Sequence, residues 1–161
     1  MRKFPLVCLI ISIFRLVTGK LVLSKKYLNT SVMMDDKKEF RVFRHIRLRT
    51  EIPGESECVF IVSFKFASLS HRANKLTSII PMLVIAGYPG FVAKIYAVCP
   101  DDGYWQGMYQ WKSVKHLNDY KESLVFRIMN RRTVPGSISL LEITNQSLTG
   151  FIESHKINNE Q

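Results

Sequence analysis

The spacing of apolar residues between positions 58 and 144 changes several times, and each change predicts a different element. The nearly continuous apolar run CVFIVSFKF at 58–66 is typical of a buried strand. Apolar residues then recur every three or four positions over 68–87, which predicts a helix that Pro81 kinks or ends early. A second apolar run, FVAKIYAVCP at 91–100, predicts the next strand.

The stretch GYWQGMYQWKS at 103–113 favours a third strand, which the turn sequence Asp101-Asp102-Gly103 connects to the second. Because successive side chains of a strand point to opposite faces, three large rings share one face around a residue with no side chain. That face holds Trp105, Gly107, Tyr109 and Trp111, and the other face holds Tyr104, Gln106, Met108 and Gln110. We therefore expect a gap beside Gly107 that a neighbouring side chain or a ligand fills.

A second amphipathic helix follows, with Ser113 placed to cap its first turn. Pro135-Gly136 ends this helix, and SISLLEIT at 137–144 predicts the last strand.

The predicted order is thus β-α-β-β-α-β, an α+β protein of the ferredoxin-like type. Right-handed crossovers place the first strand in the middle of an antiparallel sheet, beside the third, with two helices on one face. The other face is too apolar for water, and a second copy of the chain is the simplest partner for it.

Composition fits one folded domain rather than a disordered chain, since the 161 residues are 47% hydrophobic and 22% charged. We expect the folded domain at 58–145 and a polar, frayed tail at 146–161. The net charge is +10 at pH 7, and the positive excess is concentrated in residues 1–57.

Residues 1–28 form an apolar segment with basic flanks, and three interpretations remain open. We rank first an interfacial or weakly spanning membrane anchor, because the run FPLVCLIISIF is shorter than the roughly 20 residues that cross a bilayer. A cleaved signal peptide, which would export the protein, ranks second, and an apolar helix packed on the protein's own domain ranks third. Basic residues are denser after the run than before it, so we expect a cytoplasmic, membrane-associated protein.

Residues 29–57 are predicted to form a basic arm or linker. Basic and apolar side chains alternate at 45–49, which predicts a short strand, and Pro53-Gly54 predicts a turn. The positive charge suits phosphate groups, so we expect residues 1–49 to contact an anionic membrane surface, with a solvated basic edge as the alternative. No recognised nucleic-acid-binding motif accompanies the charge, which disfavours nucleic acid as a partner.

A family resemblance rests on PGFVAKIYAV, the DDG turn, YWQGMYQWKS and the amphipathic helix after it. Over about residues 58–145 the chain resembles the dimeric α+β barrel superfamily, and within it the small monooxygenases of the antibiotic-biosynthesis type. The resemblance implies a homodimer with a pocket between sheet and helices in each subunit. It also implies oxygenation of aromatic substrates without metal or flavin, although other members bind haem, isomerise lactones or have no known chemistry.

In such a pocket, aromatic side chains of the two central strands would bind the substrate. Trp105, Tyr109 and Trp111 would form walls for a flat ligand, Gly107 would leave room for it, and Tyr96 would add a ring with a polar tip.

Candidate catalytic residues are His71 and Asn74 on the first helix and Arg127 on the second, which would deprotonate and orient a substrate. Each has a structural alternative: His71 and Arg127 suit the surface, and the tryptophans suit the core. These residues leave open whether the protein is an enzyme; if it is one, we expect an oxidoreductase.

The sequence lacks the motifs of several other functions: it has no Gly-rich phosphate loop, no G-x-S-x-G sequence of serine hydrolases and no cysteine–histidine set for zinc. In the predicted sheet Cys58 and Cys99 lie roughly 10 Å apart, beyond the roughly 7 Å that a disulfide spans. We therefore expect free thiols and a reducing compartment.

The leading hypothesis is a homodimeric, cofactor-free monooxygenase-like protein that binds a small, flat, aromatic or partly apolar molecule. A non-catalytic binding or stress-response module of the same fold is the second hypothesis. The third is a haem-binding or haem-degrading protein, in which a histidine faces the pocket and Arg127 meets the propionates.

Overall fold

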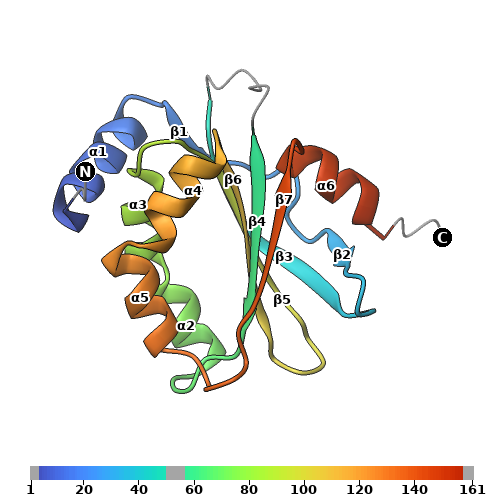
Figure 1. Ribbon diagram of the computed structural model, residues 1–161. Coiled ribbons are helices and arrows are strands. Elements are labelled where there is room, and N and C mark those ends of the chain that lie inside the picture. Colours follow the sequence, from blue (N-terminus) through green and yellow to red (C-terminus); the bar gives the residue numbers. More distant parts are fainter. Residues whose placement is uncertain (1–3, 50–56, 158–161) are drawn as a thin grey trace.

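The computed structural model describes residues 4–49 and 57–157 and is shown in Figure 1. Within these residues the chain forms six helices and seven strands. In chain order they are α1 (Pro5–Val17), β1 (Leu21–Leu23), β2 (Ser31–Met33), β3 (Glu39–Leu48), β4 (Cys58–Phe64), α2 (His71–Thr77), α3 (Ile79–Ala86), β5 (Phe91–Val98), β6 (Trp105–Trp111), α4 (Val114–Lys121), α5 (Leu124–Arg131), β7 (Ser139–Thr144) and α6 (Leu148–His155).

The strands form one antiparallel sheet in the order β1-β3-β5-β6-β4-β7, with β2 paired to β3. Four neighbours, β5-β6-β4-β7, are the strands predicted from the sequence. The first of these along the chain, β4, lies beside the third, β6, as the ferredoxin-like order requires. The predicted α+β class, the β-α-β-β-α-β order and the antiparallel sheet are therefore confirmed.

The basic N-terminal third adds strands to this sheet, because β3 pairs with β5 along most of its length. A short strand was predicted at 45–49, and the observed strand begins at Glu39 and contains a bulge between Val42 and Arg44. The predicted turn at Pro53-Gly54 lies outside the described residues.

Each of the two predicted helices is split into two short ones. The first breaks at Ser78, between α2 and α3, and not at Pro81, which lies in the first turn of α3 where a proline needs no hydrogen bond. The second breaks before Ser123, whose hydroxyl caps α5. Ser113 caps α4 as predicted, accepting a hydrogen bond from the backbone N–H of His116.

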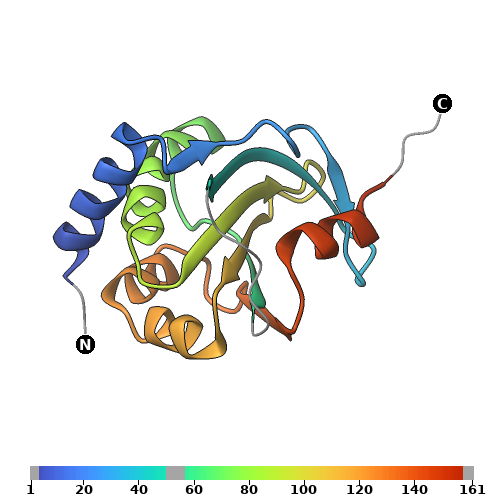
Figure 2. The ribbon, with the colours of Figure 1, turned by 90° about the horizontal axis from the view of Figure 1, so that it is seen from above.

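Both faces of the central strands β4, β5 and β6 are buried within this one chain. The rings of Trp105, Tyr109 and Trp111 pack beneath the layer of α3, α4 and α5, on the face predicted for them. The opposite face was expected to need a second copy of the chain, but α6 and side chains from residues 27–34 cover it. Figure 2 shows α6 across the sheet from the other helices. A homodimer stays a prediction.

Residues 148–155, expected within a polar tail, form α6 because three apolar residues of this segment reach the sheet. Leu148, Phe151 and Ile152 are all buried. The Gln110 carboxamide fixes the start of the helix: its Oε1 accepts a hydrogen bond from the Leu148 N–H at 3.0 Å, and its Nε2 donates to Glu57 Oε2 at 2.7 Å.

Helix α1 packs against α3 through one narrow face, on which Cys8 and Ser12 are buried. The two helices meet so closely that a Cβ atom on Gly87 would lie 1.8 Å from the Cys8 carbonyl oxygen, so only glycine fits there. The Arg15 guanidinium donates a hydrogen bond to the Ala86 carbonyl oxygen at 2.7 Å, which closes the end of α3. No helix in the described part of the chain is long and apolar enough to cross a membrane.

The packing of α6 predicts that Ile152→Ala lowers the free energy of unfolding by about 2–5 kcal/mol, because the substitution empties a fully buried site. The matched control, Thr149→Ala on the exposed side of α6, should change it by less than about 0.5 kcal/mol. Urea unfolding measures both values. Equal stabilities of the two variants would show that α6 does not pack on the sheet.

Candidate functional site

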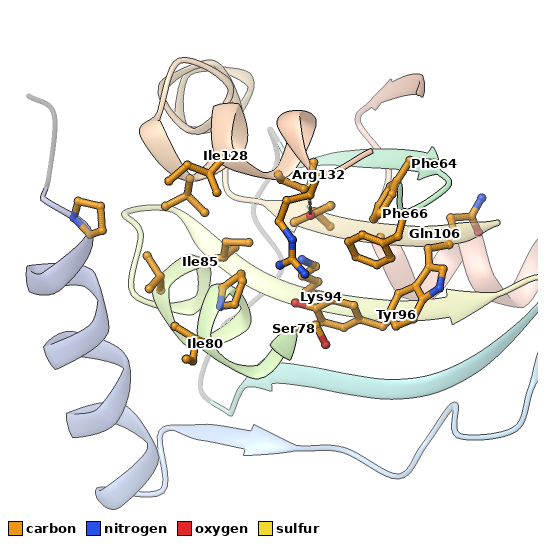
Figure 3. A pocket seen from close by; sticks show the side chains of 18 residues that line it. Phe64, Phe66, Ser78, Ile80, Ile85, Lys94, Tyr96, Gln106, Ile128 and Arg132 are labelled. Atoms are coloured by element: carbon orange, nitrogen blue, oxygen red, sulfur yellow. Dashed lines mark hydrogen bonds between the residues drawn. The ribbon is translucent and has the colours of Figure 1, made fainter. Parts of the chain in front are cut away.

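A cavity of about 260 Å³ lies between the helix layer and the face of the sheet formed by β5 and β6. Figure 3 shows the side chains around it. The lining residues are Pro5, Phe64, Phe66, Ser78, Ile80, Pro81, Val84, Ile85, Lys94, Tyr96, Trp105, Gln106, Gly107, Tyr109, Val125, Ile128, Met129 and Arg132. Since an apolar cavity of about 150 Å³ can hold benzene, this one has room for a molecule of one or two rings.

The walls follow from the alternation of the two central strands. Tyr96 on β5 pairs in register with Gly107 on β6, and the side chains of Tyr96, Trp105 and Tyr109 all point toward the helices. A Cβ atom on Gly107 would lie 2.9 Å from the Tyr109 ring, so the gap predicted beside this glycine is filled in part by Tyr109. The rest of the gap belongs to the cavity, which Gly107 also lines.

The mouth of the cavity is apolar and lies between α3 and α5. Ile80 and Ile128 line the cavity and are also exposed to solvent. Arg132, directly after α5, is the polar residue at this side, and its guanidinium lies 5.2 Å from the centre of the Phe66 ring. Asn74 helps to hold it, since Arg132 donates hydrogen bonds to Asn74 Oδ1 at 3.4 Å and Thr77 Oγ1 at 3.3 Å.

Lys94 is the most unusual residue of the cavity, because its side chain is only 3% exposed and lies among rings. Its Nζ lies 4.1 Å from the centre of the Tyr96 ring and 4.2 Å from that of Tyr109. Within residues 4–49 and 57–157 the amine forms no hydrogen bond or ion pair. In Figure 3 it lies in the middle of the lining side chains, next to Tyr96.

The environment of Lys94 favours the neutral amine. Burial lowers the pKa of Lys94 well below its ordinary value, and the nearby guanidinium of Arg44 lowers it further. The two tyrosine rings attract an ammonium ion and act in the opposite direction. Because no acidic residue of the described ranges lines the cavity, we expect burial and the Arg44 charge to prevail.

The two tyrosines beside Lys94 are neutral phenols with different surroundings. Burial raises the pKa of both Tyr96 and Tyr109. The Tyr109 hydroxyl accepts a hydrogen bond from Tyr120 at 3.4 Å and lies 3.9 Å from Met129 Sδ. The Tyr96 hydroxyl is buried and has no hydrogen-bond partner in the described part of the chain.

Four of the five predicted substrate-binding residues line the cavity: Tyr96, Trp105, Gly107 and Tyr109. The fifth, Trp111, is fully buried in the core, with its ring 4.9 Å from that of Tyr120.

None of the predicted catalytic residues lines the cavity. His71 lies behind the wall, where its Nδ1 accepts a hydrogen bond from Trp105 Nε1 at 3.0 Å. Asn74 is buried and donates to the Ser68 and Leu69 carbonyl oxygens. Arg127 is exposed on α5.

Sequence reasoning missed the two basic residues of the cavity, Lys94 and Arg132. Lys94 did carry a signal, because it is the single charged residue of the apolar run FVAKIYAV in a central strand. Arg132 carried none, since paired arginines at the end of an amphipathic helix usually face solvent.

The residues of the cavity fit haem poorly. No histidine lines it, and the raised pKa values of Tyr96 and Tyr109 oppose ligation of iron by tyrosinate. No group of three or more histidine, cysteine, aspartate or glutamate side chains in the described ranges could hold a metal ion.

Comparison with known proteins shows the fold. No protein-family model matches the chain, and no curated protein matches it. An anthrone oxidase-like protein of known structure is 14% identical with a TM-score of 0.45 over 68% of this chain, which spans 57% of that protein. An uncharacterised ferredoxin-fold protein from Listeria monocytogenes, related to antibiotic biosynthesis monooxygenases, is 10% identical with a TM-score of 0.53, over 80% of this chain and 93% of that one. The chain therefore has the ferredoxin-like fold of that protein, in agreement with the resemblance named from the sequence.

Proposed function

We propose that the cavity binds a small, flat, largely apolar molecule with an acidic group, and that Lys94 meets this group. The observation that carries the proposal is the buried, unpaired amine of Lys94 between two aromatic rings. A buried lysine is unfavourable unless it is paired, so a position without a partner in the protein suits a partner in the ligand.

The walls and the charges define the ligand class. Trp105, Phe64 and Phe66 offer ring surfaces on which a flat molecule stacks. Among the described residues that line the cavity, Lys94 and Arg132 are basic and none is acidic. A phenol, an enol or a carboxylic acid on a ring of one or two cycles matches this arrangement.

The activity that this site supports best is cofactor-free oxygenation. The neutral Lys94 amine accepts a proton from a hydroxyaromatic substrate, and the resulting ammonium stabilises the substrate anion. An electron-rich anion reduces oxygen directly, and oxidation of a CH₂ group to a carbonyl consumes one O₂ and releases one water, so no other reductant is required. The fold shared with a protein related to monooxygenases supports this proposal only by analogy.

The burial of Lys94 is better explained by a functional role than by a contribution to stability. A methionine at this position would fill similar space without a charge to desolvate. The exposed apolar mouth at Ile80 and Ile128 likewise suits passage of a ligand better than it suits a sealed core.

A second proposal concerns location: the outward side of α1 contacts a membrane surface. Leu6 is 71% and Ile10 is 67% exposed. Six further apolar residues of this segment are exposed with them: Phe4, Val7, Ile13, Phe14, Leu16 and Val17. So large an apolar surface indicates a partner.

The charge around α1 favours anionic lipid as that partner. No acidic residue precedes Asp35, whereas Lys20, Lys25 and Lys26 are exposed beyond the end of the helix. An amphipathic helix flanked by lysines is typical of segments that lie in the headgroup region. Since the opposite face of α1 is held by α3, we propose that the helix lies flat on the surface while docked to the protein.

If Lys94 is buried as an unpaired amine, Lys94→Met raises the free energy of unfolding at pH 7 by roughly 1–3 kcal/mol. The pKa of Lys94 is lower in the folded than in the unfolded state, so the unfolded state binds more protons and wild-type stability rises with pH up to about 10. Urea unfolding at neutral and alkaline pH should therefore show the difference shrinking as the pH rises. Lys115→Met, at an exposed position of α4, is the control, and a destabilised Lys94→Met protein would contradict the assignment.

With a hydroxyaromatic that carries a ring CH₂ group as substrate, the wild-type protein should consume oxygen above the autoxidation rate, and binding should quench its tryptophan fluorescence. Lys94→Met should lower the rate by roughly a hundredfold or more, as expected for loss of a general base, and Lys115→Met should not change it. Binding without oxygen uptake would instead favour the non-catalytic module, and a Soret band in the purified protein would favour haem. If the protein neither binds nor turns over any member of a panel of hydroxyaromatics, the proposal is wrong.

The membrane proposal predicts that the protein sediments with vesicles of phosphatidylcholine and phosphatidylglycerol. The double variant Leu6→Ser/Ile10→Ser should bind at least about tenfold more weakly, because each side chain contributes roughly 1.5–3 kcal/mol when buried in lipid. The control Leu140→Ser/Leu141→Ser removes two exposed leucines from β7 and should bind as the wild type does. The membrane proposal is wrong if the two double variants bind equally well, or if the wild-type protein binds pure phosphatidylcholine vesicles as well as the mixed ones.

A further inference from the structure

We infer that Lys94 is a nucleophile that forms an imine with the aldehyde or ketone group of a small aromatic ligand. The inference rests on the proposed function in one respect, namely that the cavity binds such a ligand. It adds a covalent chemistry to the site and a second class of ligand, carbonyl compounds.

Geometry places the amine correctly for this reaction. Lys94 lines the cavity from the floor of the sheet, and the rings of Tyr96 and Tyr109 hold its Nζ from two sides at 4.1 and 4.2 Å. No carboxylate in the described residues forms an ion pair with the amine, so none stabilises its protonated form. A ligand carbonyl that enters between Ile80 and Ile128 would meet this nitrogen among apolar side chains.

Imine formation requires a neutral amine, and burial of Lys94 lowers its pKa in the direction that favours this form. An exposed lysine with a pKa near 10.4 is almost entirely protonated at pH 7 and reacts slowly. Desolvation beside a second cation is the usual way in which a protein lowers the pKa of a lysine nucleophile, and both causes act on Lys94.

The reaction balances without any oxidant or reductant. The Nζ lone pair attacks the carbonyl carbon, and a proton moves from nitrogen to oxygen to give a carbinolamine. The hydroxyl group then takes up a proton and leaves as water while the C=N bond forms, and the iminium nitrogen loses its remaining proton. In sum, two N–H protons and the carbonyl oxygen leave as one water molecule.

Tyr96 is suited to position the carbonyl and to donate the proton to its oxygen. Its ring contacts the Lys94 amine, and its hydroxyl is buried without a partner in the described part of the chain. Tyr109 is less suited, because its hydroxyl already contacts Tyr120 and Met129. Apolar walls also disfavour the return of water, which stabilises the imine against hydrolysis.

Reductive trapping tests the inference. Full-length protein is incubated at pH 7 with 4-hydroxybenzaldehyde and sodium cyanoborohydride, and peptide mass mapping locates the benzyl adduct. We expect labelling of Lys94 at least about tenfold faster than that of exposed lysines such as Lys115, because burial beside Arg44 lowers the pKa of Lys94 and so raises the fraction of its amine that is neutral. Lys94→Arg should abolish the fast labelling, and Tyr96→Phe should slow it by about tenfold without changing its position.

A competition experiment on the wild-type protein keeps the test valid if the arginine variant does not fold. Phenol, which has no carbonyl group, should protect Lys94 and leave the labelling of Lys115 unchanged. Labelling confined to surface lysines, or fast labelling that persists in Lys94→Arg, would overturn the inference. Oxygen uptake that depends on Lys94, with no adduct, would contradict the imine and leave the proposed oxygenation standing. An adduct without oxygen uptake would support the imine and contradict the oxygenation.

Discussion

The architecture depends on one constraint: the strands β4, β5 and β6 carry apolar side chains on both faces, so both faces must be shielded from water. One face is shielded by helices that follow the ferredoxin-like pattern. The other is shielded by α6 and by side chains from residues 27–34, so the sheet is a middle layer rather than one wall.

The cavity arises where this shielding is incomplete. The helix layer on this face is interrupted at Ser78 and Ser123, and the cavity is lined by Ser78 from the helices and by Gly107 from the sheet. Aromatic rings bound it on the sheet side, and Lys94 interrupts them with a single amine. A core selected for stability alone would be expected to exclude that amine, which is why the cavity rather than any sequence motif defines the site.

Sequence reasoning identified the four ferredoxin-like strands and the Ser113 cap because both depend on local pattern: alternation in β6 and one hydroxyl at a helix start. It gave only the end of β3, because the bulge between Val42 and Arg44 shifts the alternation halfway along the strand. Helix α6 has eight residues, and so short a helix is stabilised by its packing and not by its own pattern. Lys94 could be noticed in its apolar run, but the lack of an acidic partner depends on residues far away in the chain.

The contact between Cys8 and Gly87 has a consequence for how the protein is made. Translation adds about 5–20 residues per second, so Gly87 follows Cys8 by roughly 4 to 16 seconds. During that interval the apolar residues of α1 cannot pack against α3, because α3 is still inside the ribosome or not yet synthesised. Factors that bind apolar nascent segments therefore have access to this helix before α3 can pack against it.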